Sequence, residues 1–137
     1  MKIEPYVFFE GRTEEALAFY RTAVGAQTTA LMRYSECPDP PPPGMLPPGS
    51  EHKVMHASMK IGDATVMCSD GGCSGKASID GCSLVYNASD EAEADRAFAA
   101  LAQGGQVTMP LGKTFFSPRF GMCTDKFGLG WMVILAQ

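Results

Sequence analysis

The strongest constraint on the fold is a repeated order of predicted elements, because each half of the chain reads as one strand, one helix and three strands. Tyr20 and Phe98 take matching places in the two predicted helices, and a Gly-x-Gln segment ends each helix, at 25–27 and 104–106. One helix and four strands cannot bury both faces of a sheet alone. The repeat therefore predicts an α+β fold, with two βαβββ modules forming a curved, mostly antiparallel eight-stranded sheet, the helices outside and a concavity within.

The first module is expected over residues 1–70 and the second over 80–137, within a single domain, with a loose glycine-rich linker at 71–79. Strands are predicted at 6–9, 27–34, 53–60 and 64–69, where β-branched and aromatic residues gather or alternate with polar ones. An amphipathic helix is predicted between the first two, with Thr13 as its N-cap and Gly25 after its last turn.

The second module begins with a predicted strand at 82–86 and a helix whose first turn resembles a capping box, Asp90 with Glu93. A short strand at 106–109 is expected to stop before Pro110. Two apolar runs between 119 and 135 flank a turn at 125–128 and predict an antiparallel hairpin. Gly128 and Gly130 are expected to supply the positive φ of that turn.

Composition excludes several classes of protein. A net charge of −4, with lysines and arginines scattered over the 137 residues, argues against a nucleic-acid partner. No apolar run approaches the roughly 20 residues of a membrane span, and the N-terminus lacks a signal-peptide pattern. The cysteines number five and no C-x-x-C pair exists, so reduced thiols and a cytoplasmic location are expected.

Several separated segments resemble the PhnB-like branch of the vicinal-oxygen-chelate superfamily, which includes glyoxalase I, extradiol dioxygenases and bleomycin-resistance proteins. They are Tyr6 to Tyr20, Val54-Met-His-Ala, Ile61-Gly-Asp, Met109-Pro-Leu, Arg119-Phe-Gly and Thr124-Asp-Lys-Phe-Gly-Leu-Gly-Trp131. The resemblance covers nearly the whole chain and implies the same paired-module fold. Some relatives carry a ubiquinone methyltransferase label, although no segment here resembles a glycine-rich SAM-binding turn.

The resemblance also implies where a metal would be held in members that use one. The four ligand positions correspond to Pro5, Ser83, Met132 and a place near Cys68 or Ser69. Proline has no donor atom and methionine suits soft metals only. No metal site and no cofactor are therefore predicted, with an atypical divalent metal as the alternative.

His56 is the candidate catalytic residue. It lies in the alternating segment 53–60, where Val54, Ser58 and Lys60 are expected on its face. A neutral imidazole can act as a general base, bind a metal or donate a hydrogen bond to a bound oxygen. The alternative is a half-buried histidine satisfied by its neighbours, whereas His52 is expected to be merely exposed.

A ligand is expected to meet His56 and a mostly apolar set of side chains: Met59, Cys68, Phe116, Arg119, Phe120, Trp131 and Met132. Each of these could instead serve packing, or, for Arg119, face solvent. Cys68 and Cys123 would act as nucleophiles only if a nearby cation lowered the thiol pKa.

Two functions remain open. The first is a small-molecule binding protein on a glyoxalase-like scaffold without the usual metal site. The alternative is a lyase, isomerase or dioxygenase-type enzyme acting on an oxygenated small molecule, with His56 as base or sole histidine ligand. A homodimer is expected, because sheet edges need covering. The segment 37–49 holds seven of the ten prolines and is expected to be a surface excursion, or a rim or lid.

Overall fold

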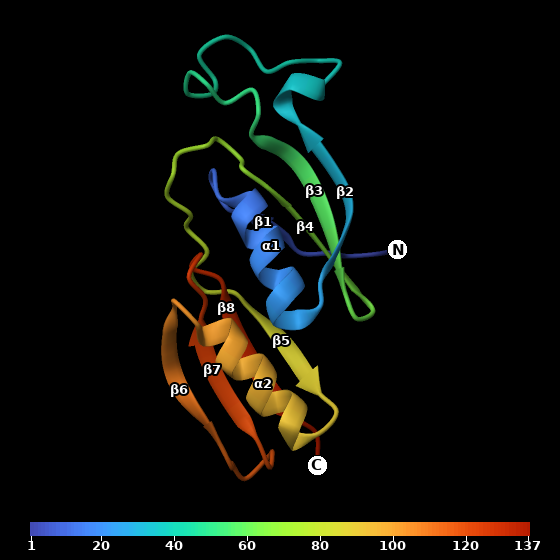
Figure 1. Cartoon of the computed structure of the whole chain (residues 1–137), viewed down its shortest axis with the longest axis vertical. Helices are drawn as coiled ribbons and strands as arrows, with labels where there is room; N and C mark the ends of the chain where they lie inside the picture. The colour runs from blue at the N-terminus through green and yellow to red at the C-terminus, as the bar shows by residue number, and fades with distance from the viewer. The chain divides into compact units, whose positions relative to one another are not determined.

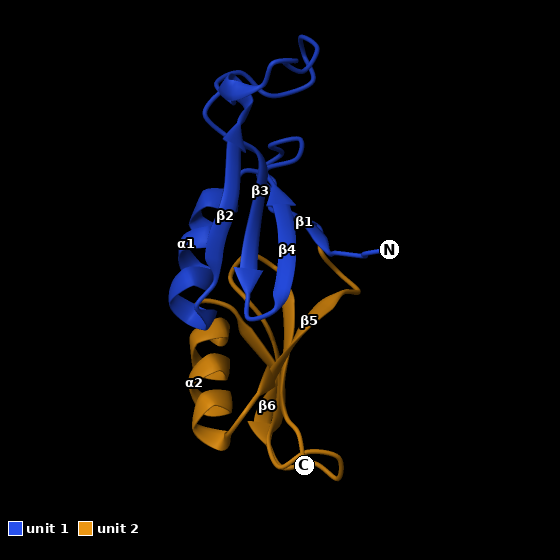
Figure 2. Cartoon of the chain, turned by 90° about the vertical axis from the view of Figure 1, so that its right-hand side faces the viewer, with its two compact units in different colours: residues 1–78 blue, residues 79–137 orange.

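The computed structural model describes residues 1–137, which divide into two compact units, 1–78 and 79–137 (Figure 2). Each unit holds one helix and four strands in the predicted order (Figure 1). The α+β class and the two βαβββ modules are confirmed. The eight strands form two separate four-stranded sheets, and each sheet has one parallel pair of strands, β1 with β4 and β5 with β8.

In the first unit, α1 packs against a sheet of strand order β1-β4-β3-β2. Its helix buries Ala16, Leu17 and Tyr20, which recur at helical spacing and face a core that includes Ala57 and Met59. The elements are β1 (Tyr6–Phe8), α1 (Thr13–Val24), β2 (Gln27–Arg33), the 3₁₀ helix η1 (Tyr34–Glu36), β3 (Val54–Ile61) and β4 (Ala64–Ser69).

The start of α1 differs from its prediction. Thr13 is the first helical residue and not the N-cap, and its hydroxyl has no hydrogen-bond partner. Asp70, at the end of β4, supplies the missing acceptor: its Oδ1 accepts from the backbone N–H of Thr13 at 2.8 Å and of Gly11 at 3.1 Å. Its Oδ2 accepts from the N–H of Val54 at 2.7 Å. The helix is thus capped by a residue distant in sequence.

The alternation predicted for residues 53–60 breaks at its first residues. Arg33 pairs with Val54 and Met32 with His56, so β3 carries one extra residue, Met55, as a β-bulge. Val54, predicted on the face of His56, is instead fully buried, as are Ala57 and Met59.

The glycine-rich stretch after β4 is bonded to the first unit. Glu10 has a positive φ of 52°, and its carboxylate accepts from the N–H groups of Gly72 and Ser74, both at 3.3 Å. The N–H of Gly75 also donates to the Glu10 carbonyl at 2.7 Å. Residues 71–75 are therefore held by hydrogen bonds to Glu10, just after β1. They do not form the loose linker that the sequence predicted.

In the second unit, α2 packs against a sheet of strand order β5-β8-β7-β6. Asp90 caps α2 as predicted, since its Oδ1 accepts from the N–H of Glu93 at 2.7 Å. Pro110 lies inside β6, not after it. β6 is an edge strand, and an edge strand tolerates proline because the N–H that proline lacks would not pair with a neighbouring strand. The elements are β5 (Ser83–Ala88), α2 (Glu91–Ala102), β6 (Gln106–Gly112), β7 (Phe120–Thr124) and β8 (Gly130–Leu135).

The predicted hairpin joins β7 and β8, and a buried Asp125 holds its turn. The Asp125 carboxylate accepts from the N–H groups of Phe127 at 2.9 Å and Leu129 at 3.1 Å, and from the Trp131 indole at 2.9 Å. Gly128 has the expected positive φ, 94°, but Gly130 does not. A Cβ at Gly130 would lie 2.5 Å from Ser83 Oγ, so close approach of β5 is what requires glycine there.

Neither helix is long and apolar enough to cross a membrane.

Candidate functional site

The first sheet has one face covered by α1 and one that α1 leaves uncovered, here called the open face. The register places Tyr6, Met67 and Ser58 in one row across three strands, and pairs His56 with Met32. Side chains of β1 to β4 therefore share this face: Tyr6, Phe8, Met32, His56, Ser58 and Met67.

His56 forms the polar centre of the open face. Its Nδ1 lies 3.0 Å from the Tyr6 hydroxyl, and its Nε2 lies 3.5 Å from Ser58 Oγ. Both partners are side chains, and the imidazole remains half-exposed. Either the Tyr6 hydroxyl donates to Nδ1 or Nδ1–H donates to the hydroxyl. The pair of Tyr6 and His56 can therefore hold or pass one proton.

Apolar and aromatic side chains surround Tyr6 and His56. The Tyr6 ring lies 5.0 Å from the Phe8 ring and 5.5 Å from the His56 ring, centroid to centroid. Phe8 is 53% exposed and Met32 39% exposed, large fractions for side chains of this kind. A hydrogen-bonding group set among accessible apolar surface is the usual composition of a small-molecule site.

Met59 and Cys68 lie on the other face of the same sheet. Both are fully buried in the core of the first unit, so they do not border the open face. Burial, followed by the charge of nearby Asp70, raises the pKa of the Cys68 thiol to about 12. Burial also raises the pKa of Cys123 to about 11. Neither thiol has the lowered pKa that nucleophilic chemistry would need.

The predicted residues of the second unit are divided between the two faces of its sheet. Phe120 and Met132 lie half-buried on the face opposite the buried Cys123 and Trp131, and Phe116 packs edge-on against Phe120 with ring centroids 4.9 Å apart. Met132 also borders a pocket of about 350 Å³ together with Ser83, Val85 and Thr124.

Trp131 and Arg119 have protein partners. Trp131 is buried and donates its indole N–H to Asp125. Arg119 forms an ion pair with Asp95 of α2, with Nη2 and Oδ1 3.0 Å apart. Arg119 is thus engaged by the helix in this structure.

At two of the four implied metal positions, the structure gives the available donor atoms another role. Pro5 uses its carbonyl to accept from the N–H of Met67, Ser69 Oγ accepts from the N–H of Gly71, and Cys68 is buried with a raised pKa. Nowhere in the chain do three or more His, Cys, Asp or Glu side chains gather as metal ligands would.

The sequence pointed to His56 as a site residue and placed Ser58 on its face, but it did not single out Tyr6. Local sequence shows Tyr6 only as one β-forming residue of the first strand. Its place beside His56, 50 residues away in sequence, depends on the parallel pairing of β1 with β4 and on the pairing of β4 with β3.

Comparison with known proteins agrees with this architecture. A family model described as 3-demethylubiquinone-9 3-methyltransferase matches residues 1–134. Protein YjdN of Escherichia coli K12 is 34% identical over 140 residues, which cover 97% of this chain and 94% of that protein.

Solved structures give the same result. Protein PA1353 from Pseudomonas aeruginosa superimposes with a TM-score of 0.85 at 38% identity, over 100% of this chain and 98% of that one. A PhnB protein from Bacillus cereus gives 0.81 at 33% identity, over 99% and 100%. The fosfomycin resistance protein FosX from Listeria monocytogenes shares the fold alone, with a TM-score of 0.64 at 10% identity, over 100% and 93%.

Proposed function

The chain belongs to the family described as 3-demethylubiquinone-9 3-methyltransferase, the PhnB-like branch of the vicinal-oxygen-chelate superfamily, and on that premise we propose that it is a small-molecule binding protein. The ligand would lie on the open face, with an oxygen atom hydrogen-bonded to His56 or Tyr6 and its apolar part against Phe8 and Met32. One observation carries this proposal: Tyr6 and His56, whose side chains lie 3.0 Å apart, are accessible to solvent and are surrounded by exposed apolar side chains.

The energetics favour a ligand that carries hydrogen-bonding atoms over one that carries none. Polar groups that a ligand covers must keep hydrogen-bond partners, because an unpaired one costs roughly 1–3 kcal/mol. While the two side chains stay bonded to one another, one of them can donate to a ligand oxygen, His56 through Nε2–H or Tyr6 through its hydroxyl, and the other can accept from a ligand hydroxyl. A ligand with one or two oxygens and a small apolar body would therefore be selected over a purely apolar one.

Titration with pyruvate and with catechol, followed by amide NMR shifts, tests the proposal. Shift changes are expected on β1 and β3. They should disappear in His56→Ala and weaken roughly two- to tenfold in Tyr6→Phe, the range of one neutral hydrogen bond. His52→Ala is the matched control, because that histidine is exposed and its ring makes no hydrogen bond. Shift changes that persist in His56→Ala, or that never occur on these strands, would overturn the proposal.

An enzyme that removes a proton next to a carbonyl group is the second candidate. The observation favouring it is that Tyr6 orients the imidazole through Nδ1, as a second group orients the base in many acid–base sites. The test is exchange of the methyl protons of pyruvate in D₂O, followed by proton NMR. Exchange faster than buffer, lost in His56→Ala and kept in His52→Ala, would support catalysis; exchange at the buffer rate would exclude this reaction.

We further propose that binding needs no metal. The support is chemical: proline, serine and methionine stand where the superfamily's metal-using members have ligands. Elemental analysis of protein purified without chelators is expected to give well under one equivalent of zinc, nickel, manganese or iron. A stoichiometric metal would contradict this proposal and leave open the binding of a ligand through His56.

A homodimer in a reducing compartment, such as the cytoplasm, is also part of the proposal. The edge strands β2 and β6 and five exposed hydrophobic side chains of the second unit support pairing of two copies. All five cysteines are free thiols, which supports a reducing compartment.

A further inference from the structure

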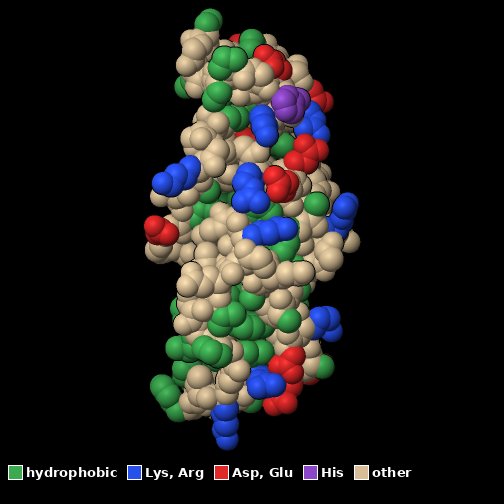
Figure 3. Space-filling view, turned by 60° about the vertical axis from the view of Figure 1, so that its left-hand side comes forward, with side chains coloured by type: hydrophobic (Ala, Val, Ile, Leu, Met, Phe, Trp, Pro, Cys, Tyr) green, Lys and Arg blue, Asp and Glu red, His purple; other side chains and the backbone are tan.

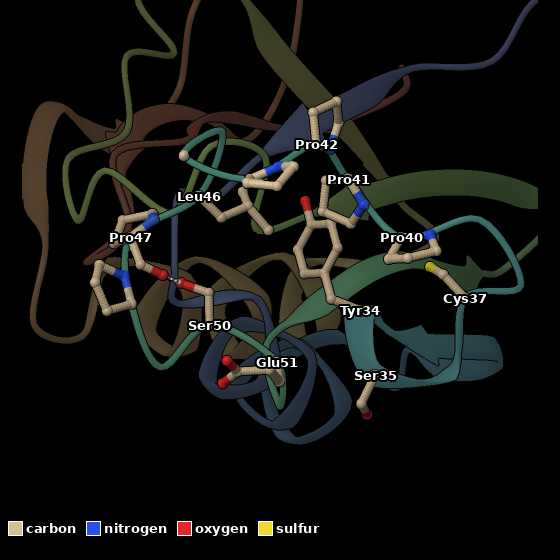
Figure 4. A pocket seen from close by; sticks show the side chains of 13 residues that line it. Tyr34, Ser35, Cys37, Pro40, Pro41, Pro42, Leu46, Pro47, Ser50 and Glu51 are labelled. Atoms are coloured by element: carbon tan, nitrogen blue, oxygen red, sulfur yellow. Dashed lines mark hydrogen bonds between the residues drawn. The ribbon is translucent and has the colours of Figure 1, made fainter.

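The proline-rich segment after η1 encloses a pocket of its own, separate from the open face in its lining. The pocket has a volume of about 410 Å³, which lies in the range of small-molecule sites. Figure 4 shows the Tyr34 ring among Pro41, Pro42 and Leu46. The remaining lining comes mainly from further prolines and from Ser35, Cys37, Gly44, Ser50 and Glu51.

The wall of this pocket is rich in hydrogen-bond acceptors and poor in donors. The lining prolines are Pro40–Pro43, Pro47 and Pro48, and each has a carbonyl but no N–H; the carbonyls of Pro42 and Pro47 already accept one hydrogen bond each. Two side-chain donors of the lining are already used, which leaves the Ser35 hydroxyl: Ser50 Oγ donates to the Pro47 carbonyl at 2.7 Å, and Cys37 Sγ to the Arg33 carbonyl at 3.7 Å. A ligand that brings its own donors is therefore favoured.

The charge of the pocket is negative. Glu51 is the only charged side chain in its lining, and it forms no ion pair. The neighbouring cations are held elsewhere. Arg33 is paired with Glu14 at 2.8 Å, and Lys53 Nζ donates to the Gly11 carbonyl at 2.9 Å. No basic group of the segment competes with a bound cation.

Tyr34 borders two pockets. Its hydroxyl donates to the Gly71 carbonyl at 2.6 Å, and burial raises its pKa, so the ring stays neutral and fixed in place. A second pocket of about 320 Å³ also borders Tyr34, and its one charged side chain is the carboxylate of Asp39. Aromatic faces attract cations through the ring quadrupole.

From these observations we propose that Tyr34 and the segment 35–51 form a binding site for a small organic cation, an amine with an aromatic or aliphatic body. The ammonium group would donate to proline carbonyls and pair with Glu51, and the body would pack against proline rings and Tyr34. The pocket of about 410 Å³ shares no lining residue with the open face, so this proposal does not rest on the function proposed for His56, although the second pocket also borders Met32.

Four ligands with the same ring test the charge requirement: benzylamine, benzyltrimethylammonium, benzyl alcohol and benzoate. Each is titrated up to about 20 mM and followed by amide NMR shifts, because ligands of this size bind in the millimolar range. Benzylamine is expected to bind most tightly, with shift changes on residues 34–51, and benzyltrimethylammonium next. Benzyl alcohol should bind at least about threefold more weakly, and benzoate not at all.

Two variants locate the cation. Glu51→Gln should weaken benzylamine binding about two- to fivefold, the worth of one exposed ion pair, while leaving benzyl alcohol unchanged. Asp63→Asn is the matched control, an exposed carboxylate in the β3–β4 turn of the same unit, and should change nothing. Tyr34→Phe keeps the ring and should retain binding, whereas Tyr34→Leu should reduce it several-fold.

The proposal is overturned if benzyl alcohol or benzoate binds as tightly as benzylamine, if shift changes map outside residues 34–51, or if Glu51→Gln and Asp63→Asn behave alike. A folded Tyr34→Leu variant with unchanged binding would also overturn it. Loss of pyruvate or catechol binding on β1 and β3 would bear only on the His56 proposal.

Discussion

Single carboxylates hold much of the irregular backbone in this protein. Asp70 and Asp125 are each buried and each accept three N–H groups from their own unit. A carboxylate has about four acceptor sites, so one residue can satisfy several amides that the loops leave unpaired. Glu93 performs the same task at the surface, for Ser89 and Tyr86.

Glu93 gives the protein a specific dependence on pH. Hydrogen bonds from the Ser89 hydroxyl and N–H and from Tyr86 lower its pKa from 4.5 to about 2. Since the pKa is lower in the folded state, the stability from this group is fully present above pH 4.5 and is lost as the pH falls toward 2.

Glu93→Gln is therefore expected to lower the free energy of unfolding at pH 7, with a difference from wild type that shrinks between pH 4.5 and pH 2. Urea unfolding at several pH values measures it, and Glu91→Gln, in the same turn of α2, is the control. A difference that is the same at every pH would contradict the assignment.

Gly130 and Ser83 form a second residue-scale test. A methyl group at position 130 would lie 2.5 Å from Ser83 Oγ and 3.1 Å from the Cys82 carbonyl. Gly130→Ala should destabilise the protein by about 1–3 kcal/mol, the usual cost of overpacking. Ser83→Ala in the same chain should recover part of that loss, because it removes the closest atom. A double-mutant cycle with no coupling between the two positions would show that the hydroxyl is not the obstacle.

Helices and strands of the first unit are held together by a side chain that belongs to none of them. The first turn of α1 has no capping side chain of its own, and Asp70 at the end of β4 accepts its N–H groups while also bonding β3 at Val54. Helix, first loop and two strands therefore share one acceptor. The start of α1 should depend on the sheet more than on its own sequence.

Asp70→Ala is expected to destabilise the first unit by about 2–4 kcal/mol, since three backbone donors lose a charged acceptor in a buried place. Hydrogen exchange should accelerate at the amides of Gly11, Thr13 and Val54, with α2 unchanged. Asp80→Ala, an exposed carboxylate without a hydrogen bond, serves as the control. Equal acceleration in both units would mean that Asp70 does not act locally.

The surface of the whole molecule carries its apolar groups unevenly. On the face shown in Figure 3, hydrophobic side chains gather over the second unit and charged ones mostly over the first. The exposed large hydrophobic residues of the second unit are Val85, Val107, Met109, Phe115 and Phe116. Val107 and Met109 lie on the edge strand β6 and Phe115 and Phe116 in the loop after it, whereas Val85 lies on the opposite edge strand, β5.

Light scattering at tens of micromolar is expected to give twice the mass of 14.6 kDa, for a symmetric homodimer. Val107→Lys and Met109→Lys on the edge strand β6 should shift the equilibrium toward monomer, because charges on an edge oppose pairing. Met45→Lys, on the proline-rich segment, is an exposed hydrophobic control. A monomer mass for the unaltered protein would exclude the dimer at that concentration.

The sequence by itself determined the elements and their repetition. Helical stripes around Tyr20 and Phe98, alternating strands and the Asp125–Gly128 turn are local patterns, because hydrophobic periodicity and turn chemistry depend on neighbours a few residues away. His56 could also be chosen from sequence, as a titratable residue in an alternating strand.

Only the tertiary structure decided what those residues meet. The cap of α1 by Asp70, the bulge at Met55 and the contact of Tyr6 with His56 each depend on strand pairing between distant segments. The same holds for Cys68 and Met59, whose residue types suit a pocket or a core equally. Sequence sets which face a side chain can take, whereas register and long-range pairing set its neighbours, and binding or catalysis depends on those neighbours.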